Sequence, residues 1–371
     1  MCSMTTDVSA PARAVHAGII GGGFMAAVHS RAARAASGAL AGSASSSAGR
    51  AAEAAERLGI AAAYDSAEEL LADPAIDVIH VCTPNTTHAD YARAALLAGK
   101  HVICEKPLAT NAADAAELAG LAAERGLVAA VPFIYRFHPM AREARARIAA
   151  GDAGPLVSVH GSYLQDWLAD PQADDWRVDP ALGGPSRAFA DIGSHLVDLL
   201  EFVAGERILR LNARTRTVYP NRAGRDAIAT EDLVAVVVEL AGGAIGTLLI
   251  SQVAPGRKNA LVVELSGARE TVRFEQERPE RLWLGRVDGS RLVDRDPARL
   301  SSEAARLSLV PAGHPMGYQD AFNAFVADAY AAIGGARPEG LPDFADGLRS
   351  ARVTEAVLAS ARSGDWAEVA A

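Results

Sequence analysis

The chain has 371 residues, of which half are hydrophobic and 22% are charged, and its formal net charge is −9. This composition is typical of a globular protein that is long enough for two domains. The acidic balance argues against nucleic acid or an anionic membrane as a partner, because phosphate binding requires a basic face.

The three cysteines are Cys2, Cys82 and Cys104. The last two fall in apolar runs and are expected to be reduced core residues of a cytoplasmic protein. Their spacing is not that of a zinc site, so no metal is expected. No apolar run reaches the roughly eighteen residues of a membrane span. Residues 1–13 lack the order of a signal peptide and are expected to form a loose leader.

An apolar strand is expected from Ala14 to Ile20, followed by a glycine-rich turn and a helix from Ala27 to Ala36. Read as Gly21-x-Gly23-x-x-Ala26, the turn matches the dinucleotide-binding fingerprint in the strand–turn–helix context that it requires. Gly21 would make the tight turn, and Gly23 would let the backbone approach a pyrophosphate at the helix amino terminus. For the glycines alone, a tight turn without a ligand is the alternative.

A second strand is expected from Leu40 to Ser43. At its end an Asp or Glu would hold the adenosine ribose of NAD, but here the chain reads Ser45-Ser46-Ser47-Ala48-Gly49-Arg50. No carboxylate would repel a 2′-phosphate, the hydroxyls can donate to it, and Arg50 can neutralise it. The pattern favours NADP over NAD, and the alternative is a flexible serine loop with a solvated Arg.

Helices and strands then alternate as far as residue 131. This alternation predicts right-handed crossovers and a parallel sheet, and thus a dinucleotide-binding Rossmann domain over residues 14–134. The expected helices are Ala51–Leu58, Glu68–Ala72, Ala89–Ala98 and Ala112–Arg125, and the expected strands are Ile76–Cys82, His101–Cys104 and Leu127–Val131.

Two of these strands end in proline turns, Thr83-Pro84-Asn85 and Glu105-Lys106-Pro107. In an open parallel sheet, the ligand binds in the crevice at the carboxyl ends of the strands. Lys106 is one of only three lysines among 36 Lys and Arg residues. Its retention suggests that a compact ammonium is needed where a guanidinium would not serve. The alternative is a surface lysine at a strand end.

From Phe133 the pattern changes. A helix (141–150), a strand (157–163), an acidic loop (165–180) and a helix that carries Asp191 and His195 come first. Consecutive strands with short turns then predict an antiparallel sheet in a substrate-binding and oligomerisation domain over residues 135–371. These strands are Leu233–Leu240, Ala244–Val253, Ala260–Leu265, Glu270–Phe274 and Leu282–Val287, and the closing helices are Tyr318–Ile333 and Phe344–Ser363.

Several ordered motifs together resemble the glucose–fructose oxidoreductase/inositol dehydrogenase (Gfo/Idh/MocA) family over nearly the whole chain. The resemblance implies an α/β fold: an N-terminal Rossmann domain plus a C-terminal α/β domain with a large open, mostly antiparallel sheet. It also implies a nicotinamide cofactor, sugar or polyol substrates, and a homodimer or homotetramer formed through the open sheet. The motifs are the glycine turn, Thr83-Pro84-Asn85, Glu105-Lys106-Pro107, Arg136-Phe137-x-Pro139, the Gly151-x-x-Gly154 turn, Asp191-Ile192-Gly193-Ser194-His195 and Phe344-Ala345-Asp346-Gly347.

Carried over to this chain, the family's catalytic lysine falls on Lys106 and its Asp-x-x-x-His pair on Asp191 and His195. The four-residue spacing places that pair on one helix face. A His near its unperturbed pKa of about 6.5 suits the base that takes the hydroxyl proton. Lys106 would stabilise the developing alkoxide, and Asp191 would hold a neighbouring hydroxyl or tune the two bases. A satisfied core histidine is the alternative for His195, and Asp198 is expected to be structural or on the helix surface.

The expected cofactor residues come from the glycine turn, the serine loop and the two proline turns. For part of the first proline turn, helix capping by Thr86 or Thr87 is the alternative. The cofactor set is Gly21, Gly23, Phe24, Met25, Ser45, Ser46, Arg50, Thr83, Pro84, Asn85, His88, Glu105 and Lys106.

On the substrate side, Trp167, Trp176 and Arg177 lie in the acidic loop. Tryptophan faces suit the apolar face of a sugar ring, and the alternative is that they anchor the loop or a subunit contact. Tyr135 and Tyr318 are further pocket candidates. The substrate set is Lys106, Arg136, Trp167, Trp176, Arg177, Asp191 and His195.

The sequence therefore predicts an NAD(P)-dependent dehydrogenase that transfers a hydride between a ring secondary alcohol of a sugar, anhydrosugar or cyclitol and a nicotinamide cofactor, NADP being favoured over NAD. One alternative is an NAD-dependent glycoside hydrolase that retains its cofactor. Another is a non-catalytic ligand-sensing regulator, against which the intact Lys106, Asp191 and His195 argue. Fold analogy does not choose the substrate.

Overall fold

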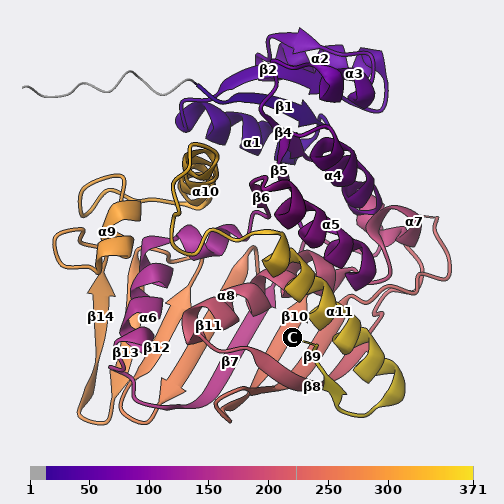
Figure 1. Cartoon of the computed structure of the whole chain (residues 1–371). Helices are drawn as coiled ribbons and strands as arrows, with labels where there is room; N and C mark the ends of the chain where they lie inside the picture. The colour runs from indigo at the N-terminus through magenta and orange to yellow at the C-terminus, as the bar shows by residue number, and fades with distance from the viewer. Residues whose placement is uncertain (1–13, 223, 371) are drawn as a thin grey trace, which may run out of the picture.

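The computed structural model describes residues 14–222 and 224–370. The chain forms two sheets, each with its own helices (Figure 1). The first sheet is entirely parallel, with strand order β3-β2-β1-β4-β5-β6. Its strands are β1 (His16–Ile20), β2 (Ala39–Ala44), β3 (Ala62–Ala63), β4 (Val78–Val81), β5 (His101–Cys104) and β6 (Ala129–Ala130).

The strand order of the first sheet reverses on either side of β1, which pairs with both β2 and β4. Such a reversal opens a crevice at the carboxyl ends of the strands, because consecutive crossovers leave the sheet in opposite directions. The helices that follow the strands are α1 (Phe24–Ala35), α2 (Ala48–Leu58), α3 (Ala67–Ala72), α4 (His88–Leu97) and α5 (Ala112–Arg125).

The second sheet has nine strands in the order β14-β13-β12-β11-β7-β10-β9-β8-β15. All of its pairs are antiparallel except β10 with β7, which is parallel. The strands are β7 (Leu156–Leu164), β8 (Ile208–Arg216), β9 (Leu233–Leu240), β10 (Ile245–Ser251), β11 (Ala260–Gly267), β12 (Thr271–Glu275), β13 (Arg281–Arg286), β14 (Gly289–Asp294) and β15 (Ala367–Glu368).

Helices cover one face of this second sheet, and Figure 1 shows α6, α8 and α11 in front of it. Along β9, buried and exposed residues alternate, because successive side chains point to opposite faces. The helices of this part are η2 (Ile134–Phe137), α6 (Pro139–Ala149), η3 (Trp176–Val178), α7 (Pro180–Gly183), the π-helical turn η4 (Phe189–Gly193), α8 (Ser194–Ala204), α9 (Ser302–Leu307), α10 (Tyr318–Ile333) and α11 (Phe344–Ser363).

The last two helices of the chain pack against the helices of the first sheet; we call each sheet with its helices a layer. Helix α10 packs against α1, and α11 packs against α5 (Figure 1). The backbone N–H of Val131 donates to the carbonyl of Pro342, so the end of the first layer is also tied to the segment before α11. These contacts close one side of the crevice and hold the two layers around it.

The expected elements differ from the observed ones mainly at their ends. Helix α1 begins at Phe24 rather than Ala27, because Gly23 already serves as its N-cap. The strand expected over 127–131 is limited to Ala129–Ala130, and the short elements α7, α9 and β15 were not predicted. Their two to six residues carry too little periodicity for a sequence signal.

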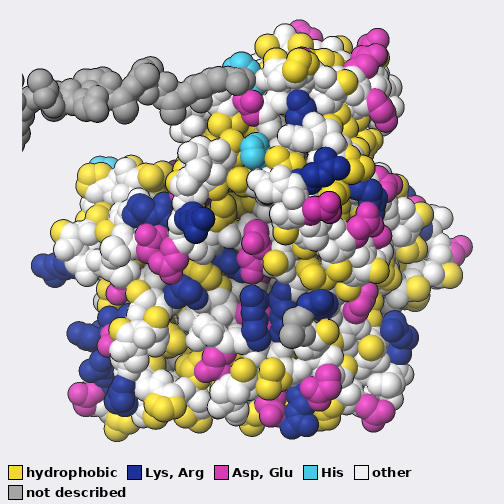
Figure 2. All heavy atoms as spheres, in the orientation of Figure 1, with side chains coloured by type: hydrophobic (Ala, Val, Ile, Leu, Met, Phe, Trp, Pro, Cys, Tyr) yellow, Lys and Arg dark blue, Asp and Glu magenta, His cyan; other side chains and the backbone are white. Residues whose placement is uncertain are grey.

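On the face shown in Figure 2, Lys and Arg side chains are interspersed with Asp and Glu over both layers. Within residues 14–222 and 224–370, no helix is both long and apolar enough to cross a membrane.

Candidate active site

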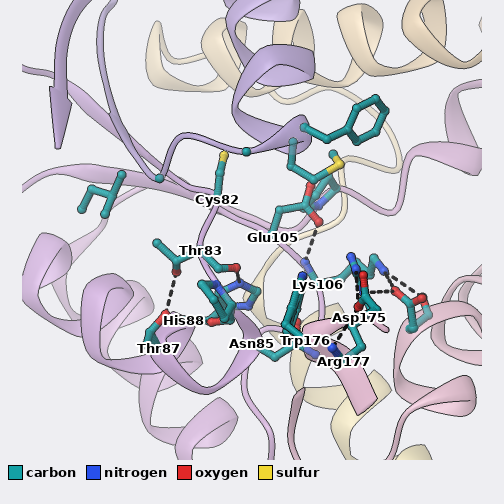
Figure 3. A pocket seen from close by; sticks show the side chains of 18 of the residues that line it. Cys82, Thr83, Asn85, Thr87, His88, Glu105, Lys106, Asp175, Trp176 and Arg177 are labelled. Carbon is teal, nitrogen blue, oxygen red and sulfur yellow. Dashed lines mark hydrogen bonds and ion pairs between the residues drawn. The ribbon is translucent and has the colours of Figure 1, made fainter. Parts of the chain in front are cut away.

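A cavity of about 960 Å³ runs along the carboxyl ends of the parallel strands. One end lies at the glycine turn and the serine loop after β2. The other end reaches Lys106 and residues of the second layer, including Asp191, His195 and Arg177. Figure 3 shows side chains of both proline turns and of the acidic loop pointing into the same space. The cavity therefore joins a dinucleotide-type turn to the predicted catalytic residues.

The glycine turn has the geometry that its fingerprint predicts. Gly21 has φ +114, and a Cβ there would lie 2.4 Å from the carbonyl oxygen of Cys82, so only glycine fits. A Cβ on Gly23 would meet nothing within 4 Å, because that position faces open space. Helix α1 has no side-chain cap and no acidic residue in its first turn. Its free N–H groups fit a pyrophosphate, which a helix amino terminus attracts.

The serine loop lies at the end of this cavity where the sequence predicts the adenosine of a dinucleotide. Ser45, Ser46 and Arg50 all line the cavity, and Arg50 Nη1 donates to Ser46 Oγ at 3.0 Å. Ser47 has a different task, since its hydroxyl accepts from the backbone N–H of Arg50 and caps α2. Phe24 and Met25 also line the cavity beside the glycine turn.

The first proline turn packs closely at the crevice. The Thr87 hydroxyl lies 2.7 Å from Thr83 Oγ1, and the Asn85 side chain donates to the carbonyl of Gly183 in α7 at 3.0 Å. Neither Thr86 nor Thr87 caps α4 through its side chain, so helix capping does not account for this turn. Thr83, Pro84, Asn85 and His88 line the cavity.

His88 joins the two proline turns. Its Nδ1 lies 2.7 Å from the carbonyl oxygen of Pro107, and its Nε2 lies 2.8 Å from that of Thr83. Burial lowers the pKa of His88, while the two carbonyls oppose this shift. His88 thus fixes the distance between the ends of β4 and β5.

Lys106 and Asp191 lie at the other end of the cavity, which we call the catalytic end after the role that the sequence predicts for them. Lys106 Nζ donates to Asp191 Oδ1 at 2.7 Å and to the Asp191 carbonyl at 2.8 Å. Gln252 Nε2 donates to Asp191 Oδ2 at 2.8 Å, and Arg177 Nε lies 3.4 Å from Oδ1. Although burial alone would raise the pKa of Asp191, the charges of Lys106 and Arg177 hold it well below its usual range. The carboxylate is therefore ionised and positions the ammonium.

Asp191 lies in the π-helical turn η4, and His195 lies in the first turn of α8. The expectation of one continuous α-helical face therefore needs correction. The Asp191 backbone carbonyl accepts from the lysine ammonium, and such π turns are frequent at functional sites. Both Asp191 and His195 still face the cavity.

The expectation that His195 keeps an unperturbed pKa is wrong. Burial, and then the charge of Lys106, lower the pKa of His195 to about 3. Its ring makes edge contacts with Phe133 and Tyr135, and its Nδ1 is buried without a hydrogen-bond partner among the described residues. The imidazole is thus neutral at neutral pH.

Buried histidines should make the protein less stable in mild acid. Burial also lowers the pKa of His138 to about 4. Between pH 6.5 and 4 the unfolded chain binds a proton at this residue that the folded chain does not, so stability falls as the pH falls. The shift at His138 corresponds to about 3 kcal/mol over that range.

Urea unfolding at pH 7, 6, 5 and 4 measures this effect. The variant His138→Phe keeps a ring between Tyr135 and Phe274, its two ring contacts, but cannot titrate. It should lose less stability than the wild type between pH 6.5 and 4. Parallel stability curves for the two proteins would contradict this assignment.

The structure brings only some of the expected substrate residues to the cavity. Trp176 and Arg177 line it, and the Arg177 guanidinium lies 4.4 Å from the Trp176 ring centroid. Trp167 is 38% exposed, donates from its indole to Gln165, and does not reach the cavity wall. This outcome fits the alternative in which Trp167 anchors the loop.

Arg136 also lies away from the cavity wall, so its expected substrate role needs correction. Its guanidinium is buried and binds Asp198 in two hydrogen bonds of 2.8 and 2.5 Å, and it binds Asp346 at 3.0 Å. A buried cation requires such partners, because desolvation is costly. Asp198 is structural, as expected, and it is buried rather than on the surface.

A group of neutral polar side chains in the wall was largely missed. Tyr135 OH and Tyr163 OH lie 2.5 Å apart, and Asn259 Oδ1 accepts from Tyr163 OH at 2.6 Å and from Gln165 Nε2 at 2.8 Å. Tyr135 and Tyr318 were pocket candidates, and both line the cavity. The position of Asn259 directly before a strand was the only sequence signal for it, and such signals are common.

Within the described ranges 14–222 and 224–370, no group of three or more His, Cys, Asp or Glu residues is arranged to hold a metal ion. The glycine turn, the uncapped helix α1 and the proline turns instead fit a dinucleotide, since they supply backbone donors and open space.

Comparison with known proteins agrees with this geometry. Residues 15–133 match the profile of the oxidoreductase family with an NAD-binding Rossmann fold, and residues 141–273 match the GFO/IDH/MocA C-terminal domain. Levoglucosan dehydrogenase of Pseudarthrobacter phenanthrenivorans is 32% identical over 96% of this chain and 98% of its own length.

Two solved structures are similar over nearly the whole chain. Levoglucosan dehydrogenase in complex with NADH and levoglucosan has a TM-score of 0.90 and 31% identity, covering 96% of this chain and 100% of its own. An inositol dehydrogenase homologue of Azotobacter vinelandii, complexed with NADH and myo-inositol, has a TM-score of 0.84 and 28% identity, covering 96% and 98%. The predicted fold class and family resemblance are both confirmed: this chain belongs to the Gfo/Idh/MocA family of nicotinamide-dependent oxidoreductases.

Proposed function

We propose that this protein is a dehydrogenase that oxidises a ring secondary alcohol of a neutral sugar, anhydrosugar or cyclitol with NAD or NADP. The observation that carries the proposal is the continuity of one cavity from the glycine turn to Lys106, Asp191 and His195. A cofactor bound along the strand ends would reach these three residues with its nicotinamide. An alcohol held by Lys106 would then lie next to that ring.

The lining of the catalytic end supports a neutral polyhydroxy substrate. Tyr135, Tyr163, Gln165 and Asn259 offer hydroxyl and amide groups but no charge, and Trp176 offers an apolar face. These groups suit the hydroxyls and the C–H face of a sugar ring. The similar levoglucosan dehydrogenase and inositol dehydrogenase homologue bind levoglucosan and myo-inositol.

A nicotinamide held by the glycine turn and the proline turns would supply the acceptor for the hydride of the carbinol carbon. Lys106 would donate a hydrogen bond to the reacting oxygen and stabilise its developing negative charge, a form of catalysis that works best where water is excluded. His195 would take the hydroxyl proton as a neutral base. Asp191 would keep the ammonium in place and favour the imidazolium when it forms. The products are a ketone, the reduced cofactor and one proton.

Absorbance of the reduced nicotinamide tests this proposal. Purified protein with NAD or NADP should give a signal with at least one member of a panel of inositols, aldoses and anhydrosugars. If no member of the panel gives an absorbance signal while cofactor binding is still measurable, the proposal is contradicted. In that case, hydrolysis of a glycoside without release of reduced cofactor would indicate a glycoside hydrolase that retains its cofactor. A sugar that raises the melting temperature without any turnover would instead indicate a ligand-sensing regulator.

The serine loop supports a preference for NADP. Arg50 and Ser46 already form a hydrogen-bonded pair at the adenosine end, and no carboxylate occupies the end of β2. Arg50→Ala should therefore weaken NADP binding by about tenfold while NAD binding changes little, because a charge-assisted contact to the 2′-phosphate is lost. Titration of both cofactors measures this effect. Arg125→Ala, an exposed change in the last turn of α5, is the control, and an equal loss for both cofactors would remove Arg50 from the phosphate site.

The open face of the second sheet supports a homodimer or homotetramer. Val237, Ile245 and Leu249 are 42%, 58% and 39% exposed on β9 and β10, and apolar side chains on a sheet face favour burial against a second copy. Analytical ultracentrifugation should therefore give a mass above that of one chain, and Leu249→Arg should lower it.

We also propose a cytoplasmic location, which the free thiols Cys82 and Cys104 support.

A further inference from the structure

A chain of buried polar side chains lies behind the catalytic end of the cavity. The Tyr330 hydroxyl on α10 lies 2.9 Å from His80 Nε2 on β4, and His80 Nδ1 lies 2.8 Å from His29 Nδ1 on α1. His29 Nε2 lies 3.0 Å from Glu105 Oε1, directly before Lys106. Both histidines are fully buried, and Glu105 and Tyr330 are each 6% exposed. The proposed mechanism assigns no role to this chain.

The two ends determine the direction of its hydrogen bonds. Although burial alone would raise the pKa of Glu105, the hydrogen bond from His29 and the nearby positive charges hold it below its usual range. A carboxylate only accepts, so His29 Nε2 must donate to it. At the other end, a buried phenol must place its hydrogen on an acceptor, and His80 Nε2 is in reach. Burial and the neighbouring His29 lower the pKa of His80, so its ring is neutral.

One arrangement satisfies both ends. Tyr330 donates to His80 Nε2, His80 Nδ1–H donates to His29 Nδ1, and His29 Nε2–H donates to Glu105. All three donors thus point toward the carboxylate, and aligned hydrogen bonds of this kind strengthen one another. The second oxygen of Glu105 accepts from the backbone N–H of Lys106 at 3.2 Å. In this arrangement Glu105 accepts from one imidazole N–H and one backbone N–H.

The charges at the catalytic end do not balance. Lys106 and Arg177 supply two positive charges, and Asp175, Asp191 and Glu105 supply three negative ones. Both cations bind Asp191, and Arg177 also binds Asp175 at 3.3 Å. Of the neighbouring groups, His195, Cys82 and Tyr318 are neutral at pH 7, since burial lowers the pKa of the histidine and raises that of the thiol and the phenol. Both ring nitrogens of His88 face carbonyl oxygens and neither contacts Glu105. Among the described residues, Glu105 is therefore the carboxylate of this end that no lysine or arginine side chain contacts, and in this sense it is the unmatched negative charge of the cavity wall.

We propose that this unmatched charge makes the site prefer the oxidised, positively charged nicotinamide over the reduced, neutral one, and that Tyr330, His80 and His29 are positioning residues that hold Glu105 in its charged form. The inference rests on the proposed function. Hydride passes directly between substrate and ring, so the ring must lie beside Lys106, and Glu105 is the preceding residue in the same wall. Attraction between opposite charges is strong where water is excluded.

Equilibrium titrations of the full chain with NAD⁺ and NADH, and with NADP⁺ and NADPH, test the proposal without turnover. In Glu105→Gln, the affinity for the oxidised form should fall by about tenfold relative to that for the reduced form, the change expected when one charge contact is removed in a partly dry site. Glu124→Gln, an exposed change on α5, is the matched control and should leave the ratio unchanged.

Two further changes test the positioning residues. Tyr330→Phe removes only the hydroxyl, so the affinity ratio should shift in the same direction by about two- to threefold. His29→Leu should shift the ratio by more, whereas His29→Gln keeps an acceptor toward His80 and a donor toward Glu105, so it should restore most of the wild-type ratio. If His29→Leu and His29→Gln give the same affinity ratio, His29 acts only through packing.

The outcomes separate this inference from the proposed function. If Glu105→Gln keeps the oxidised-to-reduced affinity ratio within about twofold of the wild type, the charge preference is wrong even though the protein binds nicotinamides. If Tyr330→Phe leaves the ratio unchanged, Tyr330 does not position Glu105. Should Glu105→Gln fail to fold, Tyr330→Phe and the two His29 variants decide the question. If the wild type itself binds neither form, the proposed function fails.

Discussion

Replacing Lys106 with Ala should lower kcat/KM for the alcohol by about 10³-fold or more, because one group both orients the reacting oxygen and stabilises its charge. Cofactor binding should change little, since the glycine turn, the serine loop and the first proline turn all remain. The fold should also survive, because Asp191 keeps Gln252 and Arg177 as partners. Steady-state assays together with cofactor titration measure these three expectations.

Lys106→Arg distinguishes a general positive charge from a compact ammonium. A guanidinium is larger, planar and always charged, so it should not restore activity beyond a small fraction. Lys258→Ala is the matched control, because the side chain of this lysine is 77% exposed and pairs with Asp166. Turnover of Lys106→Ala within about tenfold of the wild type would exclude the proposed mechanism.

Asp191→Asn should lower kcat/KM by about 10²-fold while retaining the shape of the site. The amide keeps one oxygen near Lys106, but the charge that holds Lys106 and Arg177 together disappears. Two cations would then lie close together without their shared partner, and this unbalanced charge should also weaken the fold. Steady-state kinetics and urea unfolding separate the effect on catalysis from the effect on stability.

The double variant Lys106→Ala with Asp191→Asn tests whether the two residues act as one unit. If Asp191 works by positioning the ammonium, its removal should cost almost nothing further once the lysine is gone. Multiplication of the two single losses would instead mean that Asp191 contacts the substrate independently. That result would favour the expectation in which Asp191 holds a neighbouring hydroxyl.

Local signals in the chain predicted the first layer well. The glycine turn requires a residue without a Cβ at Gly21, and apolar runs such as His101–Cys104 predict buried parallel strands. The spacing of the fingerprint and the apolar run are both read from residues close together in sequence, whereas the clash at Gly21 is with the distant Cys82. The resemblance to the family then placed Lys106, Asp191 and His195, and the structure brings all three to one cavity.

Predictions about environment were less successful. The pKa of His195 depends on Phe133, Tyr135 and Lys106, which lie 60 or more residues away along the chain. Arg136 is of a residue type that often binds ligands, yet Asp198 and Asp346 neutralise its charge in the interior. The burial of a side chain and its ion-pair partners are properties of the assembled fold, so no local sequence pattern predicts them.

The sequence by itself determined the order of the elements, the dinucleotide turn and the family, because backbone sterics and hydrophobic periodicity act over a few residues. Only the tertiary structure decided which side chains meet. Gln252 reaches Asp191, Asn259 contacts Tyr163, and Tyr330 contacts His80, which is 250 residues away along the chain. Their charge states follow from desolvation and from partners that are distant in sequence, and both exist only once the two layers have closed around the cavity.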